Sequence, residues 1–276
     1  MKIKNQVAAA LLGASAVFGM AGQAQAAFIK TDIIMMVDES GSMGDVQANL
    51  RNNIGLFASI LSDAGIDARY GLVGYGNNSV RPRLVTDLTN PAGFATAAAG
   101  LVASGGTEPG YSATAFALNS IDNQASLFSF RPDALKNLII FTDEPSNGDN
   151  CNPGCQTGGN QTTLTDADAF LTDKNALFNA VLRGNSTITS YKSLYENHGG
   201  NLYDLNQLNT NDQTVVEAFV RAFAASKVEE IQDYCDLNPN DPACQGGDVP
   251  EPGSLALAAL GLLGLTASRR RKQQAK

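Results

Sequence analysis

The chain has 276 residues, of which 43% are hydrophobic and 17% are charged, and its formal net charge is −8 at pH 7. This composition is typical of a protein with a packed core and excludes an intrinsically disordered chain. The acidic balance disfavours nucleic acid as a partner, because phosphates repel a negative surface.

The amino terminus has the three parts of a secretory signal peptide. Lys2 and Lys4 precede an uncharged, largely apolar run at 7–20, and an Ala-Gln-Ala sequence at 24–26 supplies the small residues of a cleavage site. This run is too short to span a bilayer, which takes about 20 residues. We therefore expect residues 1–26 to be removed on export.

The carboxyl terminus carries a second processing segment. Pro250, Glu251 and Pro252 are followed by an apolar stretch at 253–267 and by four basic residues at 269–272. As a helix this stretch reaches about 22 Å, less than the roughly 30 Å of a hydrocarbon core. The basic residues should stay in the cytoplasm and hold the preceding domain outside.

This order of Pro-Glu-Pro, short apolar helix and arginine cluster, which we place at 249–272, resembles the PEP-CTERM sorting signal. In that family an exosortase, a transpeptidase-like membrane enzyme, cuts the segment. The resemblance implies a Gram-negative bacterium and transient anchoring in the inner membrane by the C-terminal helix. The final location would be the cell surface or the extracellular matrix. A permanent single-pass anchor is the alternative.

Without these two ends the chain is more acidic. Their removal takes away seven basic residues and one acidic residue, so the net charge falls from −8 to about −14. Divalent ions or cationic partners are the electrostatic expectation for such a surface.

The four cysteines form an even set, as expected for disulfides in an exported protein. Three connectivities are possible, and the simplest pairs Cys151 with Cys155 and Cys235 with Cys244. A zinc site is disfavoured, because neither pair has the usual Cys-x-x-Cys spacing.

Between the two ends, apolar runs of strand length alternate with segments whose apolar residues recur at helical spacing. The expected strands are 33–37, 69–75, 83–87, 138–142, 177–182 and 201–205. The expected helices are 46–61, 94–102, 113–121, 166–174, 191–196 and 215–223. The alternation predicts an α/β fold, doubly wound, with a mostly parallel central sheet and helices on both faces. We place this domain at 28–226 and a cysteine-containing linker at 227–248.

The candidate site begins where the first strand ends. Asp38, Ser40 and Ser42 alternate in a loop before the first long helix, so their oxygens can point toward one spot. In open parallel sheets, ligands bind beyond the carboxyl ends of the strands. Taken singly, such residues often only cap a helix or a turn.

A second acid, Asp143, follows the strand at 138–142, and Thr107 lies in a glycine-flanked loop ahead of a helix. If the two strands are neighbours, Asp38 and Asp143 approach each other at one edge of the sheet. A bound cation would relieve their repulsion. Carboxylates, hydroxyls and waters make a hard oxygen shell, which suits Mg²⁺ or Mn²⁺ better than Zn²⁺.

The Asp-x-Ser-x-Ser loop, the Gly-Gly-Thr loop and the Thr-Asp strand end, in this order, resemble the metal-ion-dependent adhesion site of von Willebrand factor A (VWA) domains. The resemblance covers roughly 200 residues, and Gly-Gly-x-x-Tyr at 199–203 is similar to the family's turn into its last strand. It implies the Rossmann-like VWA fold and Mg²⁺ or Mn²⁺ in preference to Ca²⁺. Carried over by position, the metal residues are Asp38, Ser40, Ser42, Thr107 and Asp143.

In that family the neutral hydroxyl ligands leave the metal with positive charge, so an acidic group of a protein or polymer partner completes its shell. The resemblance therefore implies a binding protein and not an enzyme. Two acids depart from the family pattern: Glu144 replaces the usual glycine after Asp143, and Glu108 follows Thr107. They could raise the affinity for a cation, or compete with the partner's acid.

Two other functions stay open: a metal-dependent hydrolase at the same strand ends, and a structural surface protein whose metal serves only folding. Catalysis would need a general base over the metal, for which Glu39, Glu108, Glu144 and His198 are candidates. None of the four lies in a catalytic motif, and the sequence has neither a Gly-x-Ser-x-Gly elbow nor a phosphate-binding loop.

Overall fold

A six-stranded sheet, in the order β3-β2-β1-β4-β5-β6, forms the centre of the domain. This computed structural model describes residues 28–77, 82–121, 127–149 and 162–245, so the signal peptide, the sorting segment, Cys151 and Cys155 lie outside it. Five of the strands are parallel and β3 is an antiparallel edge. The strands are β1 (Ile29–Asp38), β2 (Ile66–Tyr75), β3 (Arg83–Thr89), β4 (Leu135–Thr142), β5 (Ala176–Leu182) and β6 (Leu202–Asp204).

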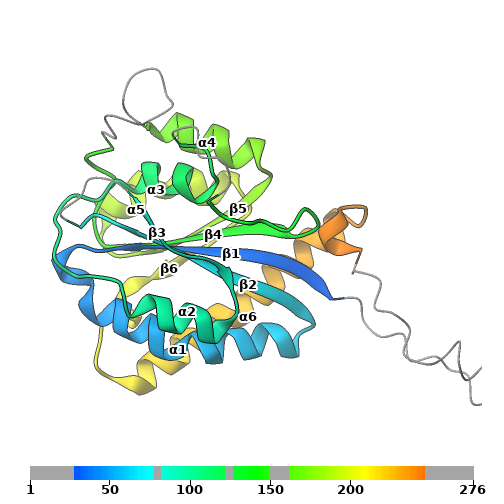
Figure 1. Cartoon of the computed structure of the whole chain (residues 1–276), viewed down its shortest axis with the longest axis horizontal. Coiled ribbons are helices and arrows are strands. Elements are labelled where there is room, and N and C mark those ends of the chain that lie inside the picture. Colours follow the sequence, from blue (N-terminus) through cyan, green and yellow to red (C-terminus); the bar gives the residue numbers. More distant parts are fainter. Residues whose placement is uncertain (1–27, 78–81, 122–126, 150–161, 246–276) are drawn as a thin grey trace, which may run out of the picture.

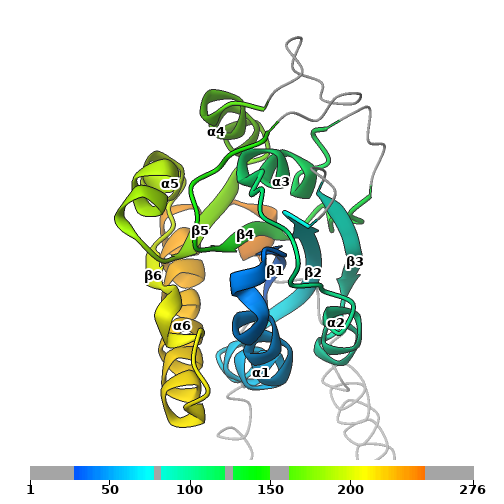
Figure 2. The ribbon, with the colours of Figure 1, turned by 90° about the vertical axis from the view of Figure 1, so that its left-hand side faces the viewer.

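Helices cover both faces of the sheet, as Figures 1 and 2 show. One face carries α1 (Gly44–Asp63), α2 (Pro91–Ala98) and α6 (Gln213–Leu237). The other face carries α3 (Gly110–Ala117), α4 (Leu164–Asp173) and α5 (Asn185–Asn197). Short 3-10 turns lie at Gly41–Met43, Leu205–Gln207 and Pro242–Cys244. The predicted doubly wound, mostly parallel α/β architecture is confirmed.

Strand β1 is apolar throughout its centre because both of its sides are buried. Ile33, Met35 and Val37 pack into the core under α1 and α6, whereas Ile34 and Met36 pack into the core under α3 and α5. Successive strand residues point to opposite faces, so a strand covered on both faces reads as a continuous apolar run.

Two predicted helices are shifted for local reasons. The helix expected at 94–102 begins earlier, where the Asn90 side chain accepts a hydrogen bond from the Gly93 N–H (2.9 Å), and it ends at Ala98. The helix expected at 191–196 begins at Asn185, because its first two turns are mostly polar and gave no apolar periodicity.

The last helix is longer than the sequence indicates. The apolar pattern stops at Phe223, but α6 continues to Leu237, and Lys227 and Glu230 on its buried face form an ion pair. A charged pair inside the core hides the helical stripe. The domain therefore does not end at Ser226, and the first part of the predicted linker is helix.

A disulfide closes the carboxyl end of the domain. Cys235, in α6, is bonded to Cys244, with 5.3 Å between their Cα atoms. The neighbouring Ala243 is buried in the core beside β1. None of the helices in the part of the chain described here has the length and apolar character that crossing a bilayer would require.

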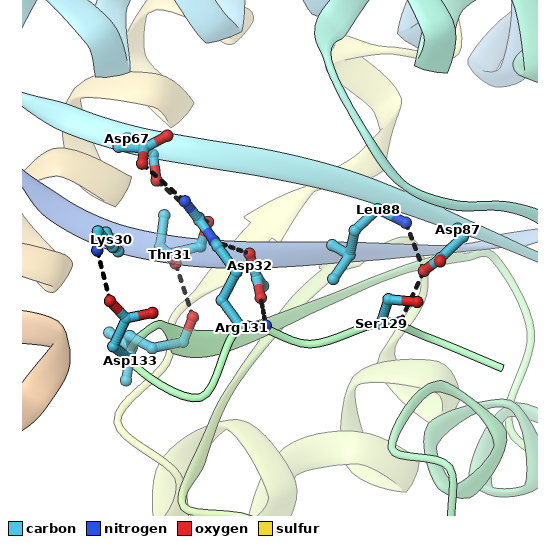
Figure 3. Close-up of polar contacts among 10 residues, drawn as sticks. Lys30, Thr31, Asp32, Asp67, Asp87, Leu88, Ser129, Arg131 and Asp133 are labelled. Carbon is cyan, nitrogen blue, oxygen red and sulfur yellow. Dashed lines mark hydrogen bonds and ion pairs between the residues drawn. The ribbon is translucent and has the colours of Figure 1, made fainter. Parts of the chain in front are cut away.

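Figure 3 shows a polar clamp at the amino ends of the strands. The Arg131 side chain donates hydrogen bonds to Asp32 and Asp67 and to the carbonyl of Thr31. Lys30 pairs with Asp133 in the same segment. This clamp fastens the segment ahead of β4 onto β1 and β2, at the end of the sheet opposite the candidate site.

Candidate metal centre

The carboxyl ends of β1 and β4 bring the two predicted metal-binding acids together. The strands are adjacent and parallel, with Val37 opposite Phe141. Figure 2 looks onto this end of the sheet. The Thr142 hydroxyl, at the end of β4, donates a hydrogen bond to Asp38 Oδ2 (2.9 Å). Asp143 follows directly, so the expected neighbourhood of the two strands is confirmed.

Four of the five predicted side chains form one string of contacts. Asp38 Oδ1 accepts a hydrogen bond from the Ser40 N–H (2.7 Å), and the hydroxyls of Ser40 and Ser42 lie 3.2 Å apart. The Ser42 hydroxyl donates to Asp143 Oδ1 (3.1 Å). Asp38 and Ser40 are buried and Ser42 is exposed, so the string leads from the core to the surface.

The fifth residue, Thr107, reaches the site through its backbone. A Cβ atom added to Gly76 would lie 2.9 Å from the Thr107 carbonyl oxygen and 3.0 Å from Asp38 Oδ1. Gly76 also has a φ of 85°, which favours glycine. The Thr107 hydroxyl makes no hydrogen bond to the other four side chains. The structure therefore places Thr107 beside Asp38 without joining its hydroxyl to the string.

The Thr107 loop is tied to the first loop by backbone hydrogen bonds. The N–H groups of Ser104 and Gly105 donate to the Glu39 carbonyl (3.0 and 3.1 Å). The Gly41 N–H donates back to the Gly105 carbonyl (3.2 Å). These bonds fix the backbones of the two loops against each other.

Asp38 is a buried carboxylate with only neutral partners. It has no exposed surface, and no Lys, Arg or His in the described part of the chain pairs with it. Burial raises its pKa to about 7, although the hydrogen bonds from Ser40 and Thr142 act in the opposite direction. A cation bound here would stabilise the ionised form.

Asp143 does have a cationic partner, which the sequence patterns do not reveal. Arg183, directly after β5, forms an ion pair with its Oδ2 atom, and the Thr187 hydroxyl donates to its carbonyl oxygen (3.0 Å). Only 5% of the Asp143 side chain is exposed, against 34% for Arg183. In the sequence, only its position directly after a predicted strand could have indicated that Arg183 lies near the candidate site.

Glu39 is occupied by structural contacts. Its buried carboxylate pairs with Arg83 and accepts hydrogen bonds from the Asn77 side chain and the Val102 N–H (2.9 Å each). It fills the space beside Gly74, where an added Cβ would meet it at 2.6 Å. Glu39 is therefore not a free general base.

The two departures from the family pattern, Glu108 and Glu144, both lie near Asp143. Glu108 is fully buried, with Oε2 accepting from Asn147 (2.7 Å) and no hydrogen-bond donor to Oε1 among the described residues. Burial raises its pKa, and the charges of Glu144 and Asp143 add to this effect. Glu144 is exposed.

His198 lies at the other end of the sheet. Its carbonyl accepts a hydrogen bond from Phe178 near the start of β5 (3.2 Å), and its ring nitrogen Nε2 lies 2.9 Å from Asp168 Oδ1. It is separated from the Asp38 site by the length of the strands and cannot act on a group bound there.

The donor set fits a hard cation. Across the described residues, no group of three or more His, Cys, Asp and Glu side chains is placed to hold a metal ion. A metal at the strand ends must therefore take part of its shell from hydroxyls and water. Two carboxylates with serine and threonine hydroxyls are the donors that Mg²⁺ and Mn²⁺ prefer.

The family model that matches the centre of the chain agrees with this architecture. A family model of the von Willebrand factor type A domain matches residues 32–168, and a model of the PEP-CTERM protein-sorting motif matches residues 248–272. Among solved structures, the chain is similar to proximal thread matrix protein 1 from the mussel byssus, at 16% identity and a TM-score of 0.47. That similarity covers 69% of this chain and 48% of the other, about half of its length. No curated protein sequence matches the chain.

Proposed function

We propose that this chain, which carries a von Willebrand factor type A domain and a PEP-CTERM sorting motif, binds an acidic partner through a divalent cation. The cation would be held by Asp38, Ser40, Ser42, Thr107 and Asp143 and would be Mg²⁺ or Mn²⁺ in preference to Ca²⁺. The observation that carries the proposal is the buried Asp38 carboxylate, which has no cationic side chain beside it among the described residues. It connects to the Asp143 carboxylate through the Ser40 backbone N–H and the hydroxyls of Ser40 and Ser42.

The charges of these residues favour an anionic ligand. Serine and threonine oxygens are neutral, and Asp143 already pairs with Arg183. Counted with Asp38, Asp143 and Arg183, a divalent cation keeps net positive charge. A carboxylate from a protein or an extracellular polymer would complete its shell. Since Ser42 is exposed, a partner can approach the string of oxygens from solvent.

Binding is favoured over catalysis because two of the four candidate bases are engaged elsewhere. Glu39 is neutralised by Arg83, and His198 lies at the opposite end of the sheet. The remaining candidates, Glu108 and Glu144, are two acids close to one another. A general base would have to be within hydrogen-bond reach of the proton it removes.

The sorting motif marks an exported protein, and we propose that it takes the domain to the cell surface or matrix of a Gram-negative bacterium. The C-terminal helix would anchor the chain in the inner membrane until an exosortase-type enzyme cuts it. Intact-mass measurement of the surface-associated protein tests this sequence of events. Loss of residues 1–26 and of the segment after Pro250 is expected, and an uncut C-terminus would indicate a permanent anchor.

Calorimetric titration of the purified, EDTA-stripped protein with Mg²⁺, Mn²⁺ and Ca²⁺ tests the metal site. We expect one binding site that is lost in Asp38→Asn and retained in Asp32→Asn. The control replaces the same residue type on the same strand, at the end fastened by Arg131. Absence of any binding that depends on Asp38 would overturn the proposal.

Partner binding can then be measured with a defined acidic polymer. Polyglutamate should bind to the wild-type protein in Mg²⁺ and not in EDTA, and Asp38→Asn should not bind it in either condition. Equal binding in Mg²⁺ and EDTA would show that the polymer does not act through the cation.

A further inference from the structure

The side chain of Arg183 stands at the rim of the candidate metal centre with most of its hydrogen-bonding capacity unused. A guanidinium group has five N–H donors. In the described part of the chain, the Arg183 side chain makes a single hydrogen bond, to Asp143 Oδ2. The side chain is 34% exposed, so it is in contact with solvent.

The two other arginines that pair with buried acids use their donors differently. Arg131 donates four side-chain hydrogen bonds, to the carboxylates of Asp32 and Asp67 and to two backbone carbonyls. Arg83 donates three, two of them to Glu39. Arg131 and Arg83 therefore make several hydrogen bonds within the protein, whereas Arg183 makes one in the described part of the chain.

The position of Arg183 gives its free donors an acceptor of predictable chemistry. A cation held by Asp38 and an arginine paired with Asp143 would place two positive groups at the same strand ends. A carboxylate has two oxygens, and a guanidinium recognises such planar groups through parallel N–H···O bonds. One oxygen can meet the cation while the other meets Arg183.

We propose that Arg183 is a second anchor for the partner's carboxylate, beside the cation, and so determines that the site selects acidic ligands. This inference rests on the proposed metal-dependent binding. It also answers the problem that Glu108 and Glu144 raise, because the charge of Arg183 offsets the repulsion that two extra acids exert on an incoming anion.

The proposal predicts that removal of the Arg183 charge changes the affinities for the metal and for the carboxylate in opposite directions. The positive charge of Arg183 repels a cation at the site, so its removal should strengthen metal binding. The same removal takes away a charge-assisted hydrogen bond to the acid and should weaken carboxylate binding. An arginine that only positioned Asp143 would give a different result, since its loss would weaken both.

The experiment compares Arg183→Gln and Arg183→Lys with Arg221→Gln, a control that removes one positive charge from the exposed side of α6. Mn²⁺ affinity is measured by calorimetry on the EDTA-stripped protein. Acetate affinity is measured on the Mn²⁺-loaded protein from the paramagnetic relaxation of the ¹³C-labelled carboxyl group. Thermal unfolding in EDTA shows whether each variant is folded.

For Arg183→Gln we expect Mn²⁺ to bind about threefold more tightly and acetate about tenfold more weakly. Arg183→Lys keeps the charge without the planar fork, so its Mn²⁺ affinity should be unchanged and its acetate affinity intermediate. Arg221→Gln should resemble the wild type in both measurements.

Unchanged acetate binding in Arg183→Gln would overturn the inference, and so would weaker Mn²⁺ binding, which would make Arg183 a support for Asp143. These outcomes leave the proposed function intact as long as the wild type binds Mn²⁺ through Asp38. A wild type that binds no Mn²⁺ would remove the proposed function and this inference together.

Discussion

Strand β1 carries a buried aspartate toward each of its ends, and the two differ in their partners. Asp32 and Asp38 are both fully buried, six positions apart. Asp32 receives the guanidinium and the backbone N–H of Arg131, as Figure 3 shows. Asp38 receives only a backbone N–H and a hydroxyl. A buried charge is costly unless it is paired. The amino end is therefore a structural joint, whereas Asp38 at the carboxyl end has no cationic partner among the described residues.

The same distinction separates all the fully buried acids of the described chain. Asp32 pairs with Arg131 and Glu39 pairs with Arg83. Asp38 and Glu108 have no cationic partner in the described residues, and both lie at the candidate metal centre. The fully buried acids that lack a cationic partner among the described residues thus lie together at the candidate metal centre.

Breaking the joint at the amino end should have the largest effect on stability. Arg131→Met keeps an unbranched apolar stem but removes the guanidinium, and so leaves the Asp32 carboxylate buried without its cation. We expect a loss of about 3–5 kcal/mol in the free energy of unfolding. Urea unfolding in EDTA measures it. The Mn²⁺ affinity of the folded variant should stay within about twofold of the wild type, and a larger loss would show that the two ends are coupled.

Removing the charge at the carboxyl end should instead spare the metal-free protein. Since the pKa of Asp38 is raised from 3.8 to about 7, the folded protein holds a proton that the unfolded chain has released. Wild-type stability in EDTA should therefore fall as the pH rises between these values, by at most about 1.4 kcal/mol per pH unit. Asp38→Asn has no carboxylate to titrate at this position, so its stability should not show this decrease. At pH 8 in EDTA it should be more stable than the wild type.

Urea unfolding of the wild type and Asp38→Asn at pH 5, 6, 7 and 8 checks this prediction. The difference between the two proteins should grow in favour of the variant as the pH rises. A difference that is constant with pH would mean that Asp38 is not an unpaired buried acid in the metal-free protein.

Sequence patterns were sufficient for the fold because the parallel strands are buried on both faces and read as unbroken apolar runs. They failed where burial involved polar groups. Lys227 and Glu230 occupy the buried face of α6 as an ion pair, so the helix seemed to end near Phe223. The first turns of α5 were missed because they are mostly polar and show no apolar periodicity.

The part of the candidate site that follows from local sequence motifs was predictable. Asp38, Ser40, Ser42 and Asp143 stand at strand ends in a recognisable order, and the structure joins them by hydrogen bonds. Arg183 could not be found from local motifs, because its ion pair with Asp143 exists only when β5 lies next to β4 in the sheet. A pairing between strand ends is a property of the sheet order and not of the motif.

The contact between the Thr107 loop and the Asp38 loop can be tested at a single glycine. Gly76→Ala places a Cβ against Thr107 and Asp38 at a φ of 85° and should cost about 1–3 kcal/mol in stability. It should also weaken Mn²⁺ binding. Gly41→Ala, in the Asp38 loop itself, has no atom within 4 Å of the added Cβ and serves as the matched control. Equal effects of the two substitutions would contradict the predicted contact.

The smallest expected effect concerns the second unpaired acid. Glu108→Gln keeps the shape and the hydrogen bond to Asn147 while it removes the charge beside Asp143. If Glu108 helps to attract the cation, Mn²⁺ affinity should fall by about threefold, because one nearby negative charge is lost in a partly screened site. The exposed Glu144→Gln should change it less, since water screens that charge. Stronger acetate binding to Mn²⁺-loaded Glu108→Gln, with unchanged Mn²⁺ affinity, would mean that Glu108 competes with the partner's acid.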